Sequence, residues 1–532
     1  MKHLIPIFVF LALSLSACTG KDFLSWNVPG VEEEGVSHDM IILGERLPDP
    51  YSVENMTKAL NAIHPSGAGR TTLDPTDFYV RFLPKDDAQM QILADAGLQL
   101  LDHPLDYRIL REGDWYHDPS LPEGSITWQY GVVPVDFEFP PSVRYERLDN
   151  CYLPDNDPAT KADGIDWAAV EREAYRLTGN GDMLLPDSRA EGDAGKYYMP
   201  EGRIAVMDPD FSAEPVGVKG VTVCCNSFVK IATAYTDEQG YYHLKKSYNT
   251  DIRYRLIFKN VKGFCQGLNL ILLPASVSTF GKQPPTGFSV VIDNFSEDKL
   301  FARCVVNNAG YDYVRASEKS AGAIAPAPRD LRLWVLGLLD FRLNIMMHQG
   351  VIIETWEPLS SGLGEYLFMA KIVQPDVYLG VNGCSSYNEI YERALLAFAQ
   401  AGHFSRVGKD WWHHYVVYTL KSLAGSSLAN PYGERGDEDS PYCELVQCYS
   451  CYCQSVLYRR HYPDSEALFG SGEWFSPQLL MYLDERGLGL EKISPLFTTD
   501  VVDMEILKLK MLSYYPEFKS VINEAFARYG EQ

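Results

Sequence analysis

Histidine and carboxylate side chains in the region 385–420 are the first candidates for chemistry in this sequence. A hydrolytic zinc site needs two histidines one helical turn apart, because side chains at i and i+4 leave one helix face and can close on a single Zn²⁺. Glu392 shares a helical stripe with His403, but the two are eleven residues apart, which corresponds to about 16 Å of helix. His413 and His414 are neighbours and diverge by about 100° on a helix. None of these pairs predicts a shared metal ion.

A group of cysteines further along is the second candidate. Their spacing is C-x₄-C-x₂-C-x-C, and its first part matches the plant-type ferredoxin spacing. The group is Cys443, Cys448, Cys451 and Cys453. Cluster loops need flexible backbone, whereas these residues lie among leucine, valine and tyrosine in a helical pattern, where small thiols pack well. We therefore predict packed thiols here, and few or no disulfides in the chain.

The stretch 396–412, LAFAQAGHFSRVGKDWW, resembles a segment of Bacteroidetes-type exported lipoproteins with a gluzincin-like zinc peptidase domain. In those proteins a His-Glu-Leu-Ala-His-Ala-Ser-His-Tyr run precedes a Val-Gly and a Trp. The overlay puts Leu396 at the first zinc histidine, Ala397 at the general base and Gln400 at the second histidine. Residues 442–450 resemble the Gly-Glu-x-Trp-Gly segment that carries the third ligand, and Gln447 falls on its glutamate.

The resemblance implies a degenerate zinc site at these four positions. Leucine and alanine offer no lone pair, and a carboxamide is a poor zinc ligand compared with imidazole or carboxylate. Gln400 and Gln447 can instead pair amide to amide, which satisfies groups that would cost about 1 to 3 kcal/mol each if buried alone. We expect these two side chains to lie close together, and we expect no catalytic residue, metal or cofactor. A histidine at the position of His403 is a supporting residue in the family pattern.

Residues 1–17 predict an export signal, because Lys2 precedes an apolar run that is too short to span a bilayer. The run ends in LSAC at 15–18, which resembles the bacterial lipobox. The resemblance implies that Cys18 carries a diacylglycerol, that 18–47 is a tether, and that acyl chains hold the protein at the cell envelope, on the outer membrane or cell surface. The alternative is ordinary secretory cleavage near Ala17, with Cys18 incidental to it.

The bulk composition predicts a folded chain of several domains. The 532 residues are 46% hydrophobic and 22% charged, which is a globular composition. With 71 acidic and 47 basic residues, the formal charge of −24 repels phosphate backbones, so nucleic acid is not an expected partner.

Residues 48–160 predict a small α/β domain, with helices over 53–63 and 85–96 and a strand over 77–83. Their order resembles the propeptide of secreted peptidases. The pair at 117–118, His followed by Asp, predicts a surface turn, because adjacent side chains in an extended chain face opposite ways. Glycines and charges in 161–201 predict a linker.

Residues 202–275 carry the clearest β pattern. A strand is predicted over 221–224 and a hairpin turn at 236–240. In the next strand the apolar positions 252, 254, 256 and 258 face one way and the basic positions 253, 255 and 259 face the other, which predicts one buried face. The runs 217–223 and 234–242 closely resemble the carboxypeptidase regulatory-like (transthyretin-like) β-sandwich, which is a non-catalytic spacer or binding module in that family.

Residues 287–532 predict a mainly helical, zincin-like domain, so the chain as a whole is classed as multidomain α+β. Strands are expected over 331–336 and 375–381. Helices are expected over 299–314, 387–403, 410–423, 442–460 and 477–486, with two more between 499 and 529.

Together these features predict a membrane-anchored lipoprotein with an inactive, metallopeptidase-like domain, which is a pseudoenzyme with a binding or structural role. Its expected partners are the membrane and a protein, peptide or glycan ligand. One alternative is an active metallopeptidase with non-standard ligands. The other is a lipoprotein that captures glycans or peptides as nutrients, which the 33 tyrosines and 9 tryptophans suggest.

Overall fold

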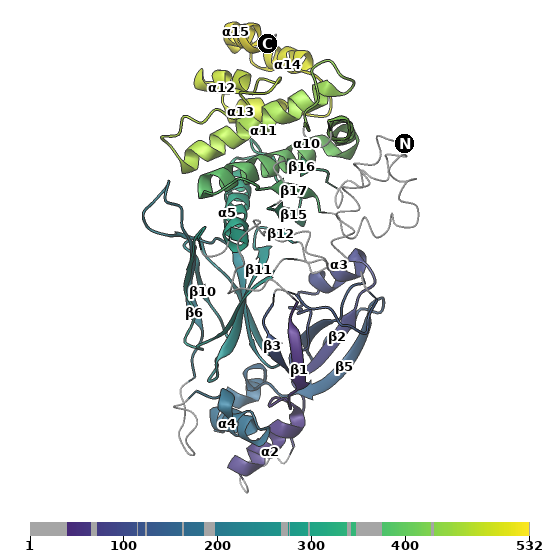
Figure 1. Cartoon of the computed structure of the whole chain (residues 1–532), viewed down its shortest axis with the longest axis vertical. Coiled ribbons are helices and arrows are strands. Elements are labelled where there is room, and N and C mark those ends of the chain that lie inside the picture. Colours follow the sequence, from purple (N-terminus) through teal and green to yellow (C-terminus); the bar gives the residue numbers. More distant parts are fainter. Residues whose placement is uncertain are drawn as a thin grey trace, which may run out of the picture.

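The computed structural model describes most of the chain from Met40 onward as a mixed α+β protein with a helical C-terminal region, as predicted (Figure 1). The described residues are 40–64, 72–113, 115–122, 125–161, 164–185, 197–267, 275, 277–295, 298–337, 342–346, 375–426 and 430–530. The expected export signal, Cys18 and most of the tether lie outside them. Among the described helices, none combines the length and apolar character needed to cross a membrane.

The N-terminal part contains two small antiparallel sheets and two helices. The elements are β1 (Ile42–Arg46) paired with β3 (Tyr107–Arg111), the sheet β4 (Gln129–Pro134), β2 (Asp77–Leu83) and β5 (Arg144–Cys151), and the helices α2 (Val53–Ile63) and α3 (Asp87–Asp95). Helix α2 begins after Ser52, whose hydroxyl accepts from the Asn55 N–H, and α3 begins after Asp86, which caps Gln89 in the same way. The predictions for 53–63 and 77–83 are confirmed, and the helix predicted over 85–96 is slightly shorter.

Helix α4 (Trp167–Leu177) falls inside the range 161–201 that the glycines predict to be a linker. Asp166 caps its first turn, and its apolar face packs against α2. The glycines lie mostly after this helix, so the linker prediction was too long at its N-terminal end. Helices α2 and α4 occupy the end of the molecule opposite the C-terminal helices (Figure 1).

The middle of the chain contributes to two sheets. One contains β6 (Glu201–Val206), β7 (Val216–Gly217), β10 (Tyr241–His243) and β14 (Val290–Ile292); the other receives β8 (Val221–Ser227), β9 (Lys230–Tyr235), β11 (Ile252–Asn260), β12 (Phe264–Gln266) and β13 (Val277–Gln283). The Gly240 N–H donates to the Asp237 carbonyl at 3.1 Å, so a tight turn forms where predicted. However, β9 pairs with β8 and β10 pairs with β6. The hairpin prediction is wrong, because this turn joins two sheets.

The larger sheet crosses the boundary predicted between 202–275 and 287–532. In the described residues it has eight strands, in the order β16-β17-β15-β12-β11-β8-β9 with β13 beside β11. The C-terminal strands are β15 (Leu331–Leu336), β16 (Arg342–Asn344) and β17 (Val377–Gly380). Strands β12 and β15 pair in parallel, with Cys265 opposite Arg332. The two predicted domains therefore share one hydrogen-bonded sheet and one apolar core.

Strand β11 is buried on both faces, which corrects the prediction of a single buried face. Tyr254 and Leu256 are each 1% exposed, as expected for the inward side. Arg255, on the opposite face, is only 2% exposed. The segment that follows α3 in the N-terminal part covers this second face (Figure 1).

Helices dominate the C-terminal part. They are α5 (Asp298–Lys319), α10 (Tyr387–Gly425), α11 (Ser440–His461), α12 (Gln478–Glu485), α13 (Leu490–Ile493), α14 (Met504–Tyr514) and α15 (Lys519–Tyr529). Gly408 interrupts α10 with φ 77° and ψ 175°, so the helices predicted over 387–403 and 410–423 meet at this residue. Helix α10 packs against α5 on one side and against α11 on another (Figure 1).

Candidate functional site

Gln400 of α10 and Gln447 of α11, two of the four positions of the expected degenerate zinc site, meet where these helices pack together. Gln400 Nε2 donates to Gln447 Oε1 at 3.5 Å, and Gln447 Nε2 donates to the Tyr415 hydroxyl at 3.1 Å. The predicted proximity of the two glutamines is therefore confirmed. Leu396 and Ala397 lie in the same apolar core.

These positions form closed packing between the helices. Leu396 and Gln447 are each 1% exposed, Gln400 is 3% exposed and Ala397 is fully buried. A hydrolytic zinc needs three protein ligands and an open position for water or substrate. Here the side chains are apolar or carboxamide, and the helices would have to separate before a peptide could reach them.

His403 lies near the glutamine pair but is enclosed by aromatic rings. The rings of Trp411, Trp412, Tyr449 and Phe497 have centroids 4.8 to 6.0 Å from its own. Its Nδ1 makes no hydrogen bond to any described residue. Burial lowers the pKa of His403 to about 3, and the charge of Arg406 acts in the same direction. The imidazole is therefore neutral at ordinary pH and serves as a core ring.

The other candidates from the sequence stay apart from one another. No group of three or more His, Cys, Asp or Glu side chains among the described residues could hold a metal ion. Burial raises the pKa of all four thiols in the 443–453 group, and the ten described cysteines are free. His414 Nδ1 lies 3.0 Å from Asp439 Oδ1. Asp118 accepts from both the N–H and the hydroxyl of Ser120, so a turn does form there.

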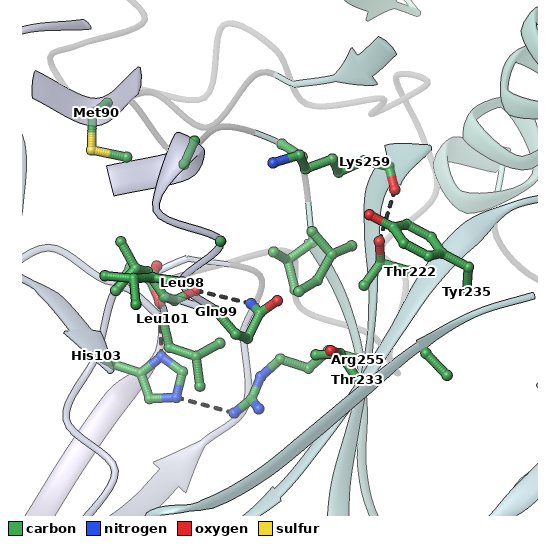
Figure 2. Close-up of a pocket in the computed structure, with 18 of the residues that line it drawn as sticks. Met90, Leu98, Gln99, Leu101, His103, Thr222, Thr233, Tyr235, Arg255 and Lys259 are labelled. Atoms are coloured by element: carbon green, nitrogen blue, oxygen red, sulfur yellow. Dashed lines mark hydrogen bonds and ion pairs between the residues drawn. The ribbon is translucent and has the colours of Figure 1, made fainter. Parts of the chain in front are cut away.

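A cavity of about 380 Å³ lies on the second face of β11, at a place that the sequence patterns did not indicate (Figure 2). Its walls come from α3 and the following segment on one side, and from strands β8, β9 and β11 on the other. Apolar lining residues include Leu98, Leu101, Ile257 and Val277. The cationic lining residues are Arg255 and Lys259, which point to separate parts of the cavity (Figure 2).

Arg255 is held by a chain of neutral hydrogen-bond partners. Its Nη1 donates to Asn226 Oδ1 at 2.7 Å, and its Nη2 lies 3.0 Å from His103 Nε2 (Figure 2). A guanidinium can only donate, so Nε2 is the acceptor and the imidazole proton lies on Nδ1. That Nδ1 lies 2.7 Å from Asp102 Oδ1 and donates to it. The Tyr116 backbone N–H donates to the other oxygen of Asp102.

Arg255 presents a positive charge to its part of the cavity. Burial lowers the pKa of Arg255 to about 10, aided by nearby Arg253, so the guanidinium is still charged at neutral pH. Burial also lowers the pKa of His103, which keeps its imidazole neutral. Within the described residues, no carboxylate oxygen lies within the 4.0 Å ion-pair distance of Arg255. The Asp102 carboxylate is separated from Arg255 by the imidazole of His103.

A second, shallower pocket of about 660 Å³ lies over β6 and β10. Tyr235 and Tyr241 line it and are 48% and 55% exposed. Polar groups at its rim include Glu201 and His243, whose side chains lie 3.6 Å apart. The pocket therefore offers two exposed rings beside hydrogen-bonding groups.

Comparisons with known proteins were negative: no protein-family model, no curated protein and no solved structure matches the chain. The resemblances to gluzincin-like lipoproteins and to the transthyretin-like sandwich rest on the residues quoted for them. The features of the structure that bear on function are the packing of α10 on α11 and the two pockets.

Proposed function

We propose that this protein is a membrane-anchored lipoprotein of the cell envelope whose zincin-like region is catalytically inactive and whose role is binding or structural. One observation carries the proposal. Where the overlay expects two zinc ligands on facing helices, Gln400 and Gln447 contact each other across closed packing.

The chemistry of the neighbouring side chains supports the same conclusion. Activation of a water molecule requires a metal to lower its pKa and a carboxylate to accept its proton. The position expected for that carboxylate is Ala397, which is fully buried and has no ionisable group. The nearest imidazole in sequence, His403, is neutral and enclosed by rings.

Metal analysis of the purified full chain tests the proposal. After dialysis against zinc, we expect less than about a tenth of an equivalent of bound zinc and no chelator-sensitive hydrolysis of casein, because the donors are missing. One equivalent of zinc together with chelator-sensitive hydrolysis would contradict the proposal and establish the alternative of an active peptidase with non-standard ligands.

A restored variant tests the overlay itself. It carries Leu396→His, Ala397→Glu, Gln400→His and Gln447→Glu. If the overlay is right, the variant gains about one equivalent of zinc, and zinc raises its melting temperature by mass action. In the matched control the three α10 substitutions are moved back by one residue along the helix, which turns the donors to a different face. A folded restored variant that binds no more zinc than this control would contradict the overlay.

Glycan capture is a second candidate, favoured by the exposed rings of Tyr235 and Tyr241 in the shallow pocket. Aromatic faces offer apolar surface to the C–H faces of sugars, while the rim supplies hydrogen bonds. We expect soluble polysaccharide to slow the protein in native affinity gels and Tyr241→Ala to abolish this retardation. Tyr514→Ala, at a tyrosine that is 64% exposed elsewhere, is the control. Equal migration of all three proteins in every polysaccharide would reject this candidate.

A further inference from the structure

We propose that the cavity between α3 and strands β8, β9 and β11 binds a small organic carboxylate with an apolar chain, whose carboxylate pairs with Arg255. The proposal rests on the proposed function, since it names a ligand for a protein that binds rather than hydrolyses.

The burial of Arg255 is the first step. Its guanidinium carries five N–H groups, and the described residues supply acceptors for two of them, on Asn226 and His103. An ionised group buried away from water is costly unless a counter-charge compensates it. At 2% exposure, Arg255 lines the cavity with three N–H groups that have no acceptor among the described residues. An anion in the cavity would supply both the acceptors and the charge.

The geometry favours a carboxylate with a single charge. The planar fork of a guanidinium matches the two oxygens of a carboxylate. Lys259, the second cationic side chain among the described lining residues, is four residues further along β11, so the two Cα atoms are about 13 Å apart at roughly 3.3 Å per residue. Figure 2 shows the Lys259 and Arg255 side chains pointing to separate parts of the cavity, so they are not placed to close on one compact polyanion. Asp102, held behind His103, also limits the positive charge at this point.

The apolar residues that line the cavity determine the chemistry of the ligand beyond its carboxylate. Leu98 and Leu101 from the segment after α3 line the cavity together with Ile257 and Val277 from the larger sheet, and a buried CH₂ group contributes about 0.8 kcal/mol. The volume of about 380 Å³ lies in the usual range for small-molecule sites, roughly 300 to 1,000 Å³. An aliphatic acid of medium length satisfies both the charge and the walls.

A catalytic role for the Asp102–His103 pair is a weaker interpretation. A general base needs a free nitrogen to take a proton, but Nε2 of His103 already accepts from Arg255. Thr222, a hydroxyl in the cavity wall, donates to the Lys259 carbonyl at 2.8 Å. The pair therefore positions Arg255 instead of activating a nucleophile.

Calorimetric titration of the full chain with octanoate tests the proposal. We expect saturable binding of one octanoate per chain, and at least tenfold weaker binding of octan-1-ol, which has the same chain but no charge. Arg255→Met should weaken octanoate binding at least tenfold. Arg253→Met is the matched control on the same strand, because Arg253 is paired with Glu112 at 2.8 Å, and it should stay within about twofold of the parent.

A second variant keeps the test decisive if Arg255→Met does not fold. Ala94→Phe fills the cavity from α3 and leaves the Arg255 contacts intact, and it should also abolish binding. Absence of octanoate binding, equal binding of octanol, or unchanged affinity in a folded Arg255→Met variant would overturn the proposal. Tighter binding of a dipeptide that ends in leucine would overturn the aliphatic acid in favour of a peptide C-terminus.

The two proposals fail separately. If the protein lacks zinc and peptidase activity and does not bind octanoate, the proposed non-catalytic role stands and the proposed ligand is rejected. If the protein contains zinc, hydrolyses casein and also binds octanoate through Arg255, the proposed carboxylate site stands and the non-catalytic role is rejected.

Discussion

Replacing Lys230 with methionine is expected to lower the free energy of unfolding by about 3 to 5 kcal/mol. The Lys230 side chain is 1% exposed, and its Nζ lies 2.9 Å from Asp155 Oδ2 and 3.1 Å from Glu171 Oε1. Glu171 is itself 4% exposed. Removal of the ammonium would therefore leave a carboxylate buried without its counter-charge, which is the costly way to break a buried ion pair.

This ion pair connects helix α4, which packs on α2 of the N-terminal part, to the larger sheet. Lys230 belongs to β9 and Glu171 to α4. The Tyr51 hydroxyl donates to Glu171, and the Lys230 ammonium lies 5.5 to 5.9 Å from the ring centroids of Tyr51, Tyr197 and Tyr248. Burial alone lowers the pKa of Lys230, but the charges of Glu171 and Asp155 outweigh it and raise the pKa. The lysine therefore stays charged in the folded protein.

Urea unfolding followed by circular dichroism measures the effect. Lys262→Met is the matched control, because Lys262 pairs with Glu318, whose side chain is 54% exposed, and exposed pairs contribute about 0 to 1 kcal/mol. A loss below about 1 kcal/mol for Lys230→Met would mean that the pair does not hold the two parts together.

The second large effect is an acid sensitivity that originates at His403. Its folded pKa of about 3 lies below the ordinary value of 6.5 because of burial, so below pH 6.5 protons bind the unfolded chain preferentially. The stability contributed by the neutral imidazole is complete above pH 6.5 and is lost as the pH falls toward 3, by about 1.4 kcal/mol per pH unit. At pH 4.5 the loss is about 2 to 3 kcal/mol.

His403→Phe is expected to remove this slope, because a phenyl ring fits among the surrounding rings and the Nδ1 has no hydrogen bond to lose. When the urea midpoint is plotted against pH, the curves of parent and variant should be parallel above pH 6.5. Below pH 6.5 they should diverge, with the variant more stable. Parallel curves down to pH 4 would show that the imidazole is protonated in the folded state.

Local elements could be predicted from the sequence, but their partners could not. The helix over 53–63 and the strand over 77–83 follow from caps and from side-chain period, which are properties of neighbouring residues. Pairing depends on segments far apart in the chain. The turn near Asp237 was recognised, yet its flanking strands enter different sheets, and no nearby residue indicates that β12 pairs with β15.

Because long-range pairing is not visible in local sequence, the glutamine pair could be predicted and the cavity at Arg255 could not. Gln400 and Gln447 were placed together by the resemblance to a zinc-peptidase motif, which assigns both positions to ligands of one ion. Arg255 alternates with apolar residues, so the pattern assigned it to solvent. Its cover comes from His103 and neighbouring residues some 150 positions earlier, and alternation along one strand carries no information about what lies on its outer face.

The parallel pairing of β12 with β15 has a consequence for how this protein can change over evolution. Exchangeable modules are joined by linkers that few contacts cross, so one can be lost while its neighbour keeps its fold. Here, deletion of the C-terminal part would strip β12 of a partner and leave an open strand edge, which invites aggregation. The middle and C-terminal parts therefore form one folding unit, and residues 202–275 contribute strands to it instead of closing a sheet of their own.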